Sequence, residues 1–364
     1  MNIVVTGLRG FPDIQGGVET HCEQLYPRIA AIGGNITVVR RKGFIKENPV
    51  RKEYKKVKFK DIYAPKITGF EAAIHTLSGV FYAFRAKADI IHIHAIGPAI
   101  AVPFAKLLGL KVVVTHHGPD YDREKWGKIS RTILKLGEYF AAKYADKIIV
   151  ISTVIRDILK TKYNRTANVH LIYNGVPTPP ANTSTNYLNE INIKPFNYIL
   201  AVGRFVKEKR FDFLIEAYLK LKSNYKLVIA GDSDYQSAYS DSLKNLADRN
   251  QVILTGMVKG DKLHELYSHA ALFVLPSSHE GLPITLLEAM SFQCKVLASN
   301  IPANMAVGLP EQHYFDLNSL DDLCSKMNCL LANDKHIPLK YDLKPYNWDN
   351  IAKETLDVYN EIVK

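Results

Sequence analysis

Cysteine is scarce in this chain, and long apolar runs are missing from it. The 364 residues include four cysteines, Cys22, Cys294, Cys324 and Cys329, scattered without the spacing of a metal site. We interpret them as reduced, mostly structural thiols. No apolar run reaches the roughly 18 residues that a membrane span needs. The first residues lead directly into a strand, without the basic and hydrophobic regions of a signal peptide, so we expect a cytoplasmic protein.

A nucleic-acid-binding module is also missing, although the chain is basic. Its formal net charge is +11, and ten Lys or Arg residues lie between Arg40 and Lys60 against Glu47 and Glu53. This basic segment, Arg40–Lys60, suits nucleic acid, an anionic membrane surface or solvent. No zinc-finger spacing, RNP pattern or recognition helix accompanies it, so we expect no nucleic-acid partner. Peripheral contact with the inner face of the cell membrane and an ordinary solvated surface both stay open.

Metal-binding and dinucleotide-binding patterns are missing too. His92 and His94 alternate along an apolar run and would share one face of a sheet. Because no carboxylate or cysteine completes a metal site nearby, we interpret them as packed or hydrogen-bonded histidines. The glycines between Gly7 and Gly17 do not follow the G-x-G-x-x-G spacing of a dinucleotide-binding turn. We therefore expect no metal ion and no cofactor.

Two series of strand-like runs alternate with helical patterns, which predicts parallel sheets in an α/β protein. The predicted strands are Asn2–Thr6, Ile36–Arg40, Ile90–His94, Val112–Thr115 and Lys147–Ser152, then Ile199–Val202, Lys226–Ala230, Val252–Thr255, Ala271–Leu275 and Lys295–Ala298. The predicted helices are Val18–Ile32, Glu71–Lys87, Pro98–Leu108 and Ile129–Ala145, then Phe211–Lys222, Ser237–Asp248, Lys262–Ser268 and Thr285–Phe292.

The length of the chain fits two domains rather than one. Residues 1–176 carry the first series and residues 196–346 the second. Residues 177–195 between them, rich in Pro, Asn, Thr and Ser, are interpreted as a linker. Residues 347–364 form an amphipathic helix with apolar side chains available for packing. We predict two doubly wound, Rossmann-like domains that face each other across a cleft.

The most informative motif lies between Glu280 and Glu288, after a predicted buried strand. Gly281 allows close approach of a ligand, and Pro283 suits the first position of a helix. A helix start of this kind favours a phosphate. Glu280 and Glu288 can then accept hydrogen bonds from hydroxyl groups on either side of that phosphate. A nucleotide-diphosphate sugar has this layout, with sugar hydroxyls, a diphosphate and ribose hydroxyls.

Three further segments are placed to bind a ligand at the ends of predicted strands. Gly16 and Gly17 open the first helix after a long loop, whose backbone N–H groups could wrap a diphosphate or an acceptor. Arg204 and Lys209 follow Gly203 in a strand-to-helix loop, where two cations can clamp a diphosphate. The stretch His116-His117-Gly118 ends a buried strand, where ligands of open α/β sheets bind.

These motifs resemble those of the retaining glycosyltransferases of family 4, which have the GT-B architecture. The E-G-L-P-I-T-L-L-E-A stretch is similar to the E-x7-E motif of that family, the loop after Gly203 to its G-R-x4-K-G pattern, and the stretch ending at Gly118 to its T-x-H-G. Arg210 stands where the family has glycine, which questions how the loop turns. Residues 118–126 are similar to a subgroup that includes rhamnosyltransferases. The resemblance covers nearly the whole chain.

The resemblance implies a role for each matching residue. Arg204 and Lys209 would neutralise the departing diphosphate, Glu280 would hold the sugar and Glu288 the ribose. His117 would lie near the transferred sugar, with His116 structural. The matching motifs also imply donor or acceptor contacts at Gly16, Gly17, Gly203, Gly281 and Leu282. The last helix would cross back onto the first domain, and Glu19 would steady the start of the first helix rather than do chemistry.

We therefore predict a retaining, metal-independent glycosyltransferase that uses a nucleotide-diphosphate sugar. Its acceptor would be a glycan or a lipid-linked sugar of cell-surface polysaccharide synthesis. No Asp-x-Asp segment is placed to hold a metal ion, because Asp232-Ser233-Asp234 falls where base contacts are expected. Two alternatives stay open: a sugar-nucleotide epimerase on the same frame, and a nucleotide-sugar-binding protein without catalysis.

Overall fold

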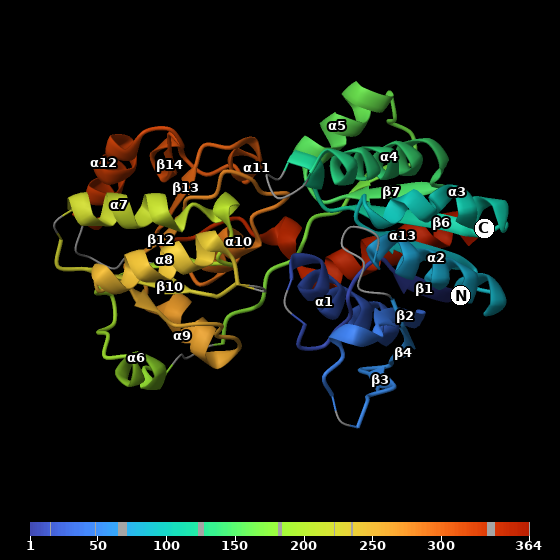
Figure 1. Ribbon diagram of the computed structural model, residues 1–364, viewed down its shortest axis with the longest axis horizontal. Helices are drawn as coiled ribbons and strands as arrows, with labels where there is room; N and C mark the ends of the chain where they lie inside the picture. The colour runs from blue at the N-terminus through green and yellow to red at the C-terminus, as the bar shows by residue number, and fades with distance from the viewer. Residues whose placement is uncertain are drawn as a thin grey trace. The chain divides into compact units, whose positions relative to one another are not determined.

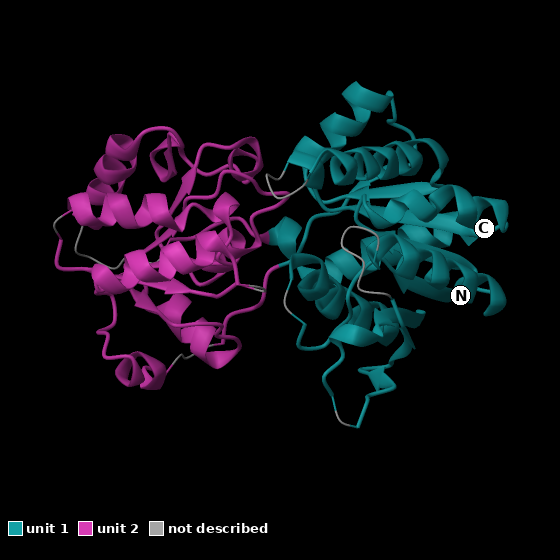
Figure 2. Ribbon diagram, viewed as in Figure 1, with its two compact units in different colours: residues 1–175, 344–364 teal, residues 176–343 magenta. Residues whose placement is uncertain are grey.

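The computed structural model describes residues 1–14, 16–47, 49–64, 71–122, 127–180, 184–221, 223–233, 236–332 and 339–363. They form two compact units (Figure 2). Unit 1 comprises Met1–Gly175 with Lys344–Lys364, and unit 2 comprises Val176–Leu343. Each unit has its own central sheet with helices packed on it (Figure 1). Among the described residues, no helix is long and apolar enough to cross a membrane.

The central strands of the sheet of unit 1 are apolar runs buried on both faces, as is usual for parallel strands. Its order is β3-β4-β2-β1-β5-β6-β7-β8, and every pair is parallel except the β3–β4 hairpin. The strands are β1 (Asn2–Thr6), β2 (Asn35–Arg41), β3 (Glu53–Tyr54), β4 (Val57–Ile62), β5 (Ile90–His94), β6 (Lys111–His116), β7 (Lys147–Val150) and β8 (Val169–Leu171).

The helices of unit 1 connect these strands, and the last one comes from the end of the chain. They are α1 (Gly17–Ala31), α2 (Glu71–Arg85), α3 (Val102–Leu107), α4 (Lys128–Tyr144), α5 (Thr153–Tyr163) and α13 (Trp348–Val363). Short 3₁₀ turns are η1 (Lys42–Phe44), η2 (Pro98–Ala101), η3 (Asp120–Asp122) and η6 (Lys344–Tyr346).

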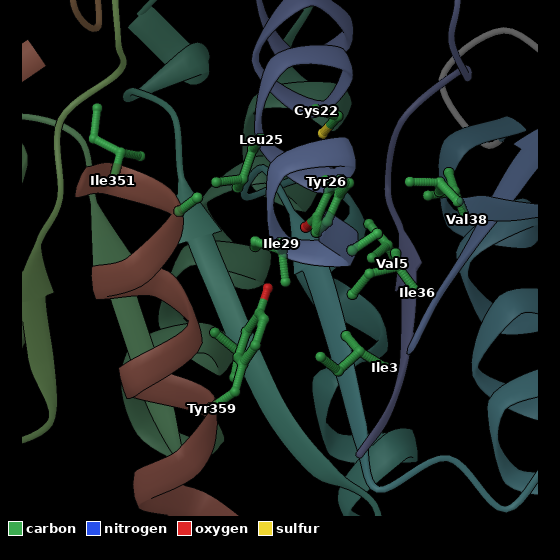
Figure 3. Close-up of a cluster of buried hydrophobic side chains, with 14 of the residues drawn as sticks. Ile3, Val5, Cys22, Leu25, Tyr26, Ile29, Ile36, Val38, Ile351 and Tyr359 are labelled. Carbon is green, nitrogen blue, oxygen red and sulfur yellow. The ribbon is translucent and has the colours of Figure 1, made fainter. Parts of the chain in front are cut away.

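Helices α1 and α13 lie side by side on one face of the sheet of unit 1 (Figure 3). The apolar face of α13 places Ile351 and Tyr359 in the same core as Tyr26 of α1. Ile3 and Val5 of β1 face this core, because alternate residues of a strand point to the same face. The amphipathic pattern of the last helix is thus satisfied by burial within unit 1.

The other face of this sheet is covered by α2. A Cβ atom at Gly79 would lie 2.7 Å from Oγ1 of Thr6, so α2 approaches β1 on the face opposite to Ile3 and Val5. Right-handed connections between parallel strands produce this arrangement, with helices on both faces of a doubly wound sheet.

Unit 2 repeats the same construction with six strands among its described residues, all in parallel pairs. Their order is β11-β10-β9-β12-β13-β14. The strands are β9 (Tyr198–Val202), β10 (Lys226–Ala230), β11 (Ile253–Leu254), β12 (Leu272–Leu275), β13 (Val296–Ser299) and β14 (Tyr314–Phe315). The helices are α6 (Asn186–Glu190), α7 (Phe211–Leu221), α8 (Ala238–Arg249), α9 (Asp261–Ser268), α10 (Ile284–Ser291), α11 (Pro302–Met305) and α12 (Leu320–Leu331), with 3₁₀ turns η4 (Lys207–Lys209) and η5 (Glu311–His313).

The strand order reverses once in each unit, beside β1 in unit 1 and beside β9 in unit 2. Consecutive connections leave β1 toward β2 on one side and reach β5 on the other, and β9 lies in the same way between β10 and β12. At such a switch point the loops at the carboxyl ends of the two central strands diverge, and ligands of this fold class bind there. The structure therefore directs attention to the loops after β1, β5, β9 and β12.

Several elements differ from the sequence predictions. The basic segment forms the β3–β4 hairpin, and Arg40 within it is fully buried. Its guanidinium group pairs with Asp61 at 2.7 Å and stacks over the ring of Phe59. Helix α5 and strand β8 were not predicted, and neither was α6, which lies in the predicted linker. Leu188 of α6 is buried and its backbone N–H bonds to Glu265 of α9, so this part of the linker belongs to unit 2.

Gly231, at the end of β10, backs directly onto the loop after β9. A Cβ atom there would lie 1.9 Å from the carbonyl oxygen of Gly203, and its φ of 147° also disfavours a side chain. We predict that Gly231→Ala lowers the free energy of unfolding by about 1–3 kcal/mol. Urea denaturation measures it, with Gly43→Ala as control, since a Cβ at Gly43 meets no atom within 4 Å. Equal stability of the two variants would contradict this close packing.

Candidate functional site

In unit 2, the loops after β9 and β12 are joined by a short ion pair. Nζ of Lys209 lies 2.6 Å from Oε1 of Glu280, and both side chains are largely buried. The backbone N–H of Ser278 also donates to the carbonyl oxygen of Glu208 at 2.8 Å. The structure thus brings Lys209 and Glu280 together at the switch point, although 71 residues separate them in the sequence.

The loop after β9 follows the path of a glycine-containing loop although it carries Arg210. Arg210 has a φ of 47°, a left-handed conformation that glycine adopts more easily. Its Nη1 donates to the carbonyl oxygen of Leu317 at 2.7 Å, and its guanidinium lies over the ring of Phe213. Arg210 is therefore anchored to neighbouring residues of unit 2, and the loop turns without a glycine at this position. Lys209, which precedes it, passes over Gly203, and Arg204 lies in the same loop.

Glu288 lies on α10, half-buried, and accepts a hydrogen bond from the hydroxyl of Tyr267 at 2.9 Å. Burial raises its pKa to about 7, while the Tyr267 hydrogen bond and the positive charge of Lys209 oppose the rise. A carboxyl group in this state can accept or donate a hydrogen bond near neutral pH. Lys209 therefore acts on both acidic residues of the motif, Glu280 and Glu288.

Helix α10, between these two glutamates, begins at Ile284, one residue before the predicted start at Thr285. Pro283 is the residue before the helix, not its first residue. The side chain of Leu282 is buried and its carbonyl oxygen accepts from the N–H of Ile284, so Leu282 belongs to the core. Gly281 precedes it in the turn. In the nearby 232–233 stretch, Asp232 pairs with Lys244 at 2.8 Å, and Asp234 lies outside the described residues.

In unit 1, the loop before α1 is fixed by a buried carboxylate. Glu19 accepts from the backbone N–H of Arg9 at 3.1 Å and pairs with its side chain. A Cβ atom at Gly16 would lie 2.0 Å from Oε2 of Glu19, whereas one at Gly17 would meet no atom within 4 Å. Through these contacts with Arg9, Glu19 steadies the loop. Gly16 is required by this packing, and Gly17 is open.

Histidines gather at the switch point of unit 1. Nδ1 of His94, at the end of β5, lies 2.9 Å from Nε2 of His117, which follows β6. Nε2 of His94 contacts the hydroxyl of Tyr26. The ring of His21, on α1, lies 5.1 Å from that of His117 and 5.6 Å from that of His94. His117 is half-buried, while His21 and His94 are buried.

His92 continues this network toward α13. Its Nδ1 lies 2.6 Å from the hydroxyl of Tyr359, and its Nε2 lies 2.7 Å from the hydroxyl of Thr115. The hydrogen bonds predicted for His92 and His94 are therefore confirmed. Burial lowers the pKa of His21 to about 4 and that of His92 to about 3, and it holds the pKa of His94 and His117 well below the usual value.

His116 has a structural role, as predicted, in a separate buried network. Its Nε2 lies 3.0 Å from Oε1 of Glu138, which also accepts from Lys162 and Tyr163 at 2.6 Å. Burial alone would raise the pKa of Glu138, but these partners lower it to about 2. The network anchors the segment after β6 through the hydroxyl of Tyr121. Residues 123–126 of the predicted acceptor-side stretch lie outside the described residues.

Comparison with known proteins identifies the class of enzyme to which this chain belongs. Residues 185–341 match the family model described as Glycosyl transferases group 1, and residues 15–179 match the model described as Glycosyltransferase Family 4. Between them the two models match most of the chain. The chain is a group 1, family 4-like glycosyltransferase. The sequence-based prediction of an enzyme of this class is thereby confirmed.

Similarity to individual proteins supports this assignment. The glycosyltransferase is 27% identical to alpha-maltose-1-phosphate synthase of Mycobacterium tuberculosis, over 96% of this chain and 97% of that one. It is 30% identical to an uncharacterized glycosyltransferase of Methanocaldococcus jannaschii over 61% of this chain, and the match spans 62% of that relative's length.

Solved structures show the same fold at low sequence identity. Sucrose-phosphate synthase from Thermosynechococcus elongatus superposes with a TM-score of 0.81 at 19% identity, over 99% of this chain and 98% of that one. An Anabaena protein crystallised with UDP-glucose gives 0.74 at 15% identity, over 100% and 98%. The predicted GT-B architecture of two Rossmann-like units is confirmed at the level of the fold.

The sequence motifs did not indicate two side chains of the glycosyltransferase's candidate sites, Tyr267 and His21. Tyr267 lies on α9, within a helical pattern that marks it as ordinary core. His21 lies on the buried face of α1 among apolar residues. Its closeness to the loop that Gly16 and Gly17 open is the only signal that could have singled it out.

The raised pKa of Glu288 predicts a pH-dependent stability. In the unfolded chain this carboxyl group ionises near pH 4.5, and in the folded protein near pH 7. Folding therefore favours the protonated form, so its contribution is complete below about pH 4.5 and is lost as the pH rises to about 7. The loss is at most about 3 kcal/mol.

Urea denaturation at several pH values between 4.5 and 7 measures this effect. The free energy of unfolding should fall more steeply with pH in the wild-type enzyme than in Glu288→Gln, which cannot ionise. Titration of other groups is common to both proteins and cancels in the difference. Parallel pH profiles would show that the pKa of Glu288 is not raised.

Proposed function

We propose that the protein transfers a sugar from a nucleotide-diphosphate sugar, with retention of anomeric configuration and without a metal ion. The observation that carries this proposal is the Lys209–Glu280 pair at the carboxyl ends of β9 and β12. A switch point of this kind binds nucleotides in doubly wound units. The similar Anabaena structure holds UDP-glucose, which supports a donor of the same class.

The Lys209–Glu280 ion pair is suited to a site that binds an anion. Without a donor, Glu280 neutralises Lys209 at 2.6 Å. A diphosphate would bind both Lys209 and Arg204 and would displace Glu280 from Lys209. Glu280 would then accept hydrogen bonds from the sugar hydroxyls. Positive charge held in place before the reaction stabilises the negative charge that grows on the leaving diphosphate. No metal ion is then needed for that purpose.

The remaining donor contacts follow from the positions of the loops. Glu288 would bind the ribose hydroxyls, since its carboxyl group is half-buried and close enough to Lys209 to feel its charge. Gly203 and Gly281 would allow the backbone to approach the diphosphate and the sugar. The leaving phosphate would assist in removing the proton of the acceptor hydroxyl, with attack on the same face of the sugar.

Unit 1 would bind the acceptor, which we take to be a glycan or a lipid-linked sugar of cell-surface polysaccharide synthesis. His117 follows β6 at the switch point and is half-buried, and its ring would contact the transferred sugar. The loop that Gly16 and Gly17 open, fixed by Glu19, would supply backbone N–H groups. The segment after Gly118 would add acceptor contacts, as in the rhamnosyltransferase-like subgroup.

Two substitutions test the role of the cationic loop. Arg204→Ala and Lys209→Ala are each expected to lower kcat by about 100–1,000-fold, the usual cost of removing one preorganised group that stabilises developing charge. The effect on KM should be smaller, because the charge matters most as the bond to the diphosphate breaks. Lys207→Ala, an exposed cation of the same loop, is the matched control.

The assay combines titration calorimetry with measurement of donor turnover, after UDP, GDP and dTDP are compared for thermal stabilisation. A pure KM effect with unchanged kcat would contradict the proposed role of the pair. Donor binding without turnover by the wild-type protein would favour the non-catalytic binding protein. Conversion of the donor to an epimer would favour the epimerase.

We also propose that the enzyme associates weakly with anionic membranes through the basic segment. Arg40 is buried and Arg41 mostly so, which leaves eight exposed cations in the segment. They are Lys42, Lys46, Arg51, Lys52, Lys55, Lys56, Lys58 and Lys60. Each basic residue near an anionic surface contributes about 1 kcal/mol, reduced by salt.

Liposome flotation at low and high salt tests this surface. The wild-type protein should float with anionic vesicles at low salt and be released at high salt. Replacing Lys55, Lys56 and Lys58 of the β3–β4 hairpin by Glu should abolish flotation.

The matched control replaces three exposed lysines outside the segment, Lys160, Lys226 and Lys353, by Glu. Equal loss in both triple variants would mean that only net charge matters. Equal flotation on neutral and anionic vesicles would leave the basic segment as a solvated surface.

A further inference from the structure

Three histidines of unit 1 bring nitrogen atoms to one point in space. They are His21 on α1, His94 at the end of β5 and His117 after β6, and one ring nitrogen of each lies within 4.8 Å of the other two. In a tetrahedral site with metal–nitrogen distances of about 2.0–2.1 Å, ligand nitrogens lie about 3.3 Å apart. Small rotations of the imidazole rings therefore suffice to bring all three onto one ion.

His21 has a chemical need for a partner at this point. Its side chain is 3% exposed, and neither ring nitrogen has a hydrogen-bond partner among the described residues. The side chain of Asn174 interacts with His21, but the geometry between Oδ1 of Asn174 and the ring nitrogens falls short of a hydrogen bond. A buried polar group without a partner costs about 1–3 kcal/mol. A ligand held at His21 would remove that cost.

His94 is oriented by a neighbour in the way that metal-binding histidines usually are. The hydroxyl of Tyr26 holds Nε2 of His94, which leaves Nδ1 pointing to His117. The hydroxyl of Tyr26 also contacts Nδ1 of His92, which in turn contacts the hydroxyl of Tyr359. Such outer contacts fix the tautomer and the ring orientation of a ligand.

We propose that His21, His94 and His117 form a binding site for one divalent transition-metal ion of the zinc class. Three imidazole ligands favour Zn²⁺, Co²⁺, Ni²⁺ or Cu²⁺, whereas Mg²⁺ and Ca²⁺ prefer oxygen ligands, which this set lacks. The fourth position is left to water or another small ligand, on the side of half-buried His117.

Binding at this site requires a change of tautomer. The 2.9 Å contact between Nδ1 of His94 and Nε2 of His117 holds a single proton, since one nitrogen donates and the other accepts. Both nitrogens need free lone pairs to bind the ion, so this proton moves to the other nitrogen of its own ring, and both imidazoles stay neutral. The ion would join α1 to the ends of β5 and β6. The site lies wholly in unit 1, whereas the Lys209–Glu280 pair lies in unit 2.

Cobalt is the probe that tests the site, on full-length protein freed of any histidine tag and treated with a chelator. Co²⁺ should bind with a stoichiometry of one per chain and give the visible absorption bands of a tetrahedral site. Zn²⁺ should displace it and raise the melting temperature.

Variants locate the ion, with circular dichroism to verify folding. His117→Ala and His21→Ala should each abolish the cobalt bands, and Tyr26→Phe should weaken binding by about 10–100-fold. His117 is half-buried, so its variant is informative even where His21→Ala fails to fold. His170→Ala, elsewhere in unit 1, is the matched control and should bind like the wild type.

Absence of tetrahedral cobalt bands in the wild-type protein would overturn the proposal. Retention of the bands in folded His117→Ala would do the same, because the ion would then lie elsewhere. All of these readouts are independent of sugar transfer, so their failure leaves the proposed function untouched.

Discussion

The reversal of strand order beside β9 and beside β1 is the constraint on which the rest of this structure depends. Parallel strands carry their carboxyl ends to one edge of the sheet, and the reversal separates the two loops that follow the central strands. In unit 2 this edge receives Lys209 and Glu280, and in unit 1 it receives His94 and His117. The candidate functional residues of each unit therefore lie where the two loops separate.

The two units differ in the kind of side chain that lies at this edge of the sheet. In unit 2 the loops are held by charge, since Lys209 pairs with Glu280 and also acts on Glu288. In unit 1 they are held by neutral rings, with His94 between Tyr26 and His117. A paired cation can exchange its partner for a diphosphate, whereas buried neutral imidazoles offer lone pairs. The Lys209–Glu280 pair therefore suits an anionic donor, and the histidines of unit 1 suit a transition-metal ion.

Buried polar groups also connect the site of unit 1 to its core. Tyr359 reaches from α13 to His92, so the helix at the end of the chain contributes to the network behind His94. Glu138 performs a similar task for the segment after β6, because four neighbouring groups satisfy its charge. These contacts fix the loops from behind and leave His117 accessible.

The sequence by itself determined the fold class and the segments that are proposed to bind the donor. Periodicity placed most strands within one or two residues, and the spacing of Glu280 and Glu288 after a buried strand located one ligand-facing edge. The sequence did not reveal α6 or the burial of Arg40. Both lie in segments of polar composition, and the few apolar or charged side chains that are buried there have partners far along the chain. Only the tertiary structure decided that Arg210 takes a left-handed turn, that Leu282 is core, and that His21 meets His94 and His117. Those facts depend on contacts between residues distant in sequence, and no local pattern encodes such contacts.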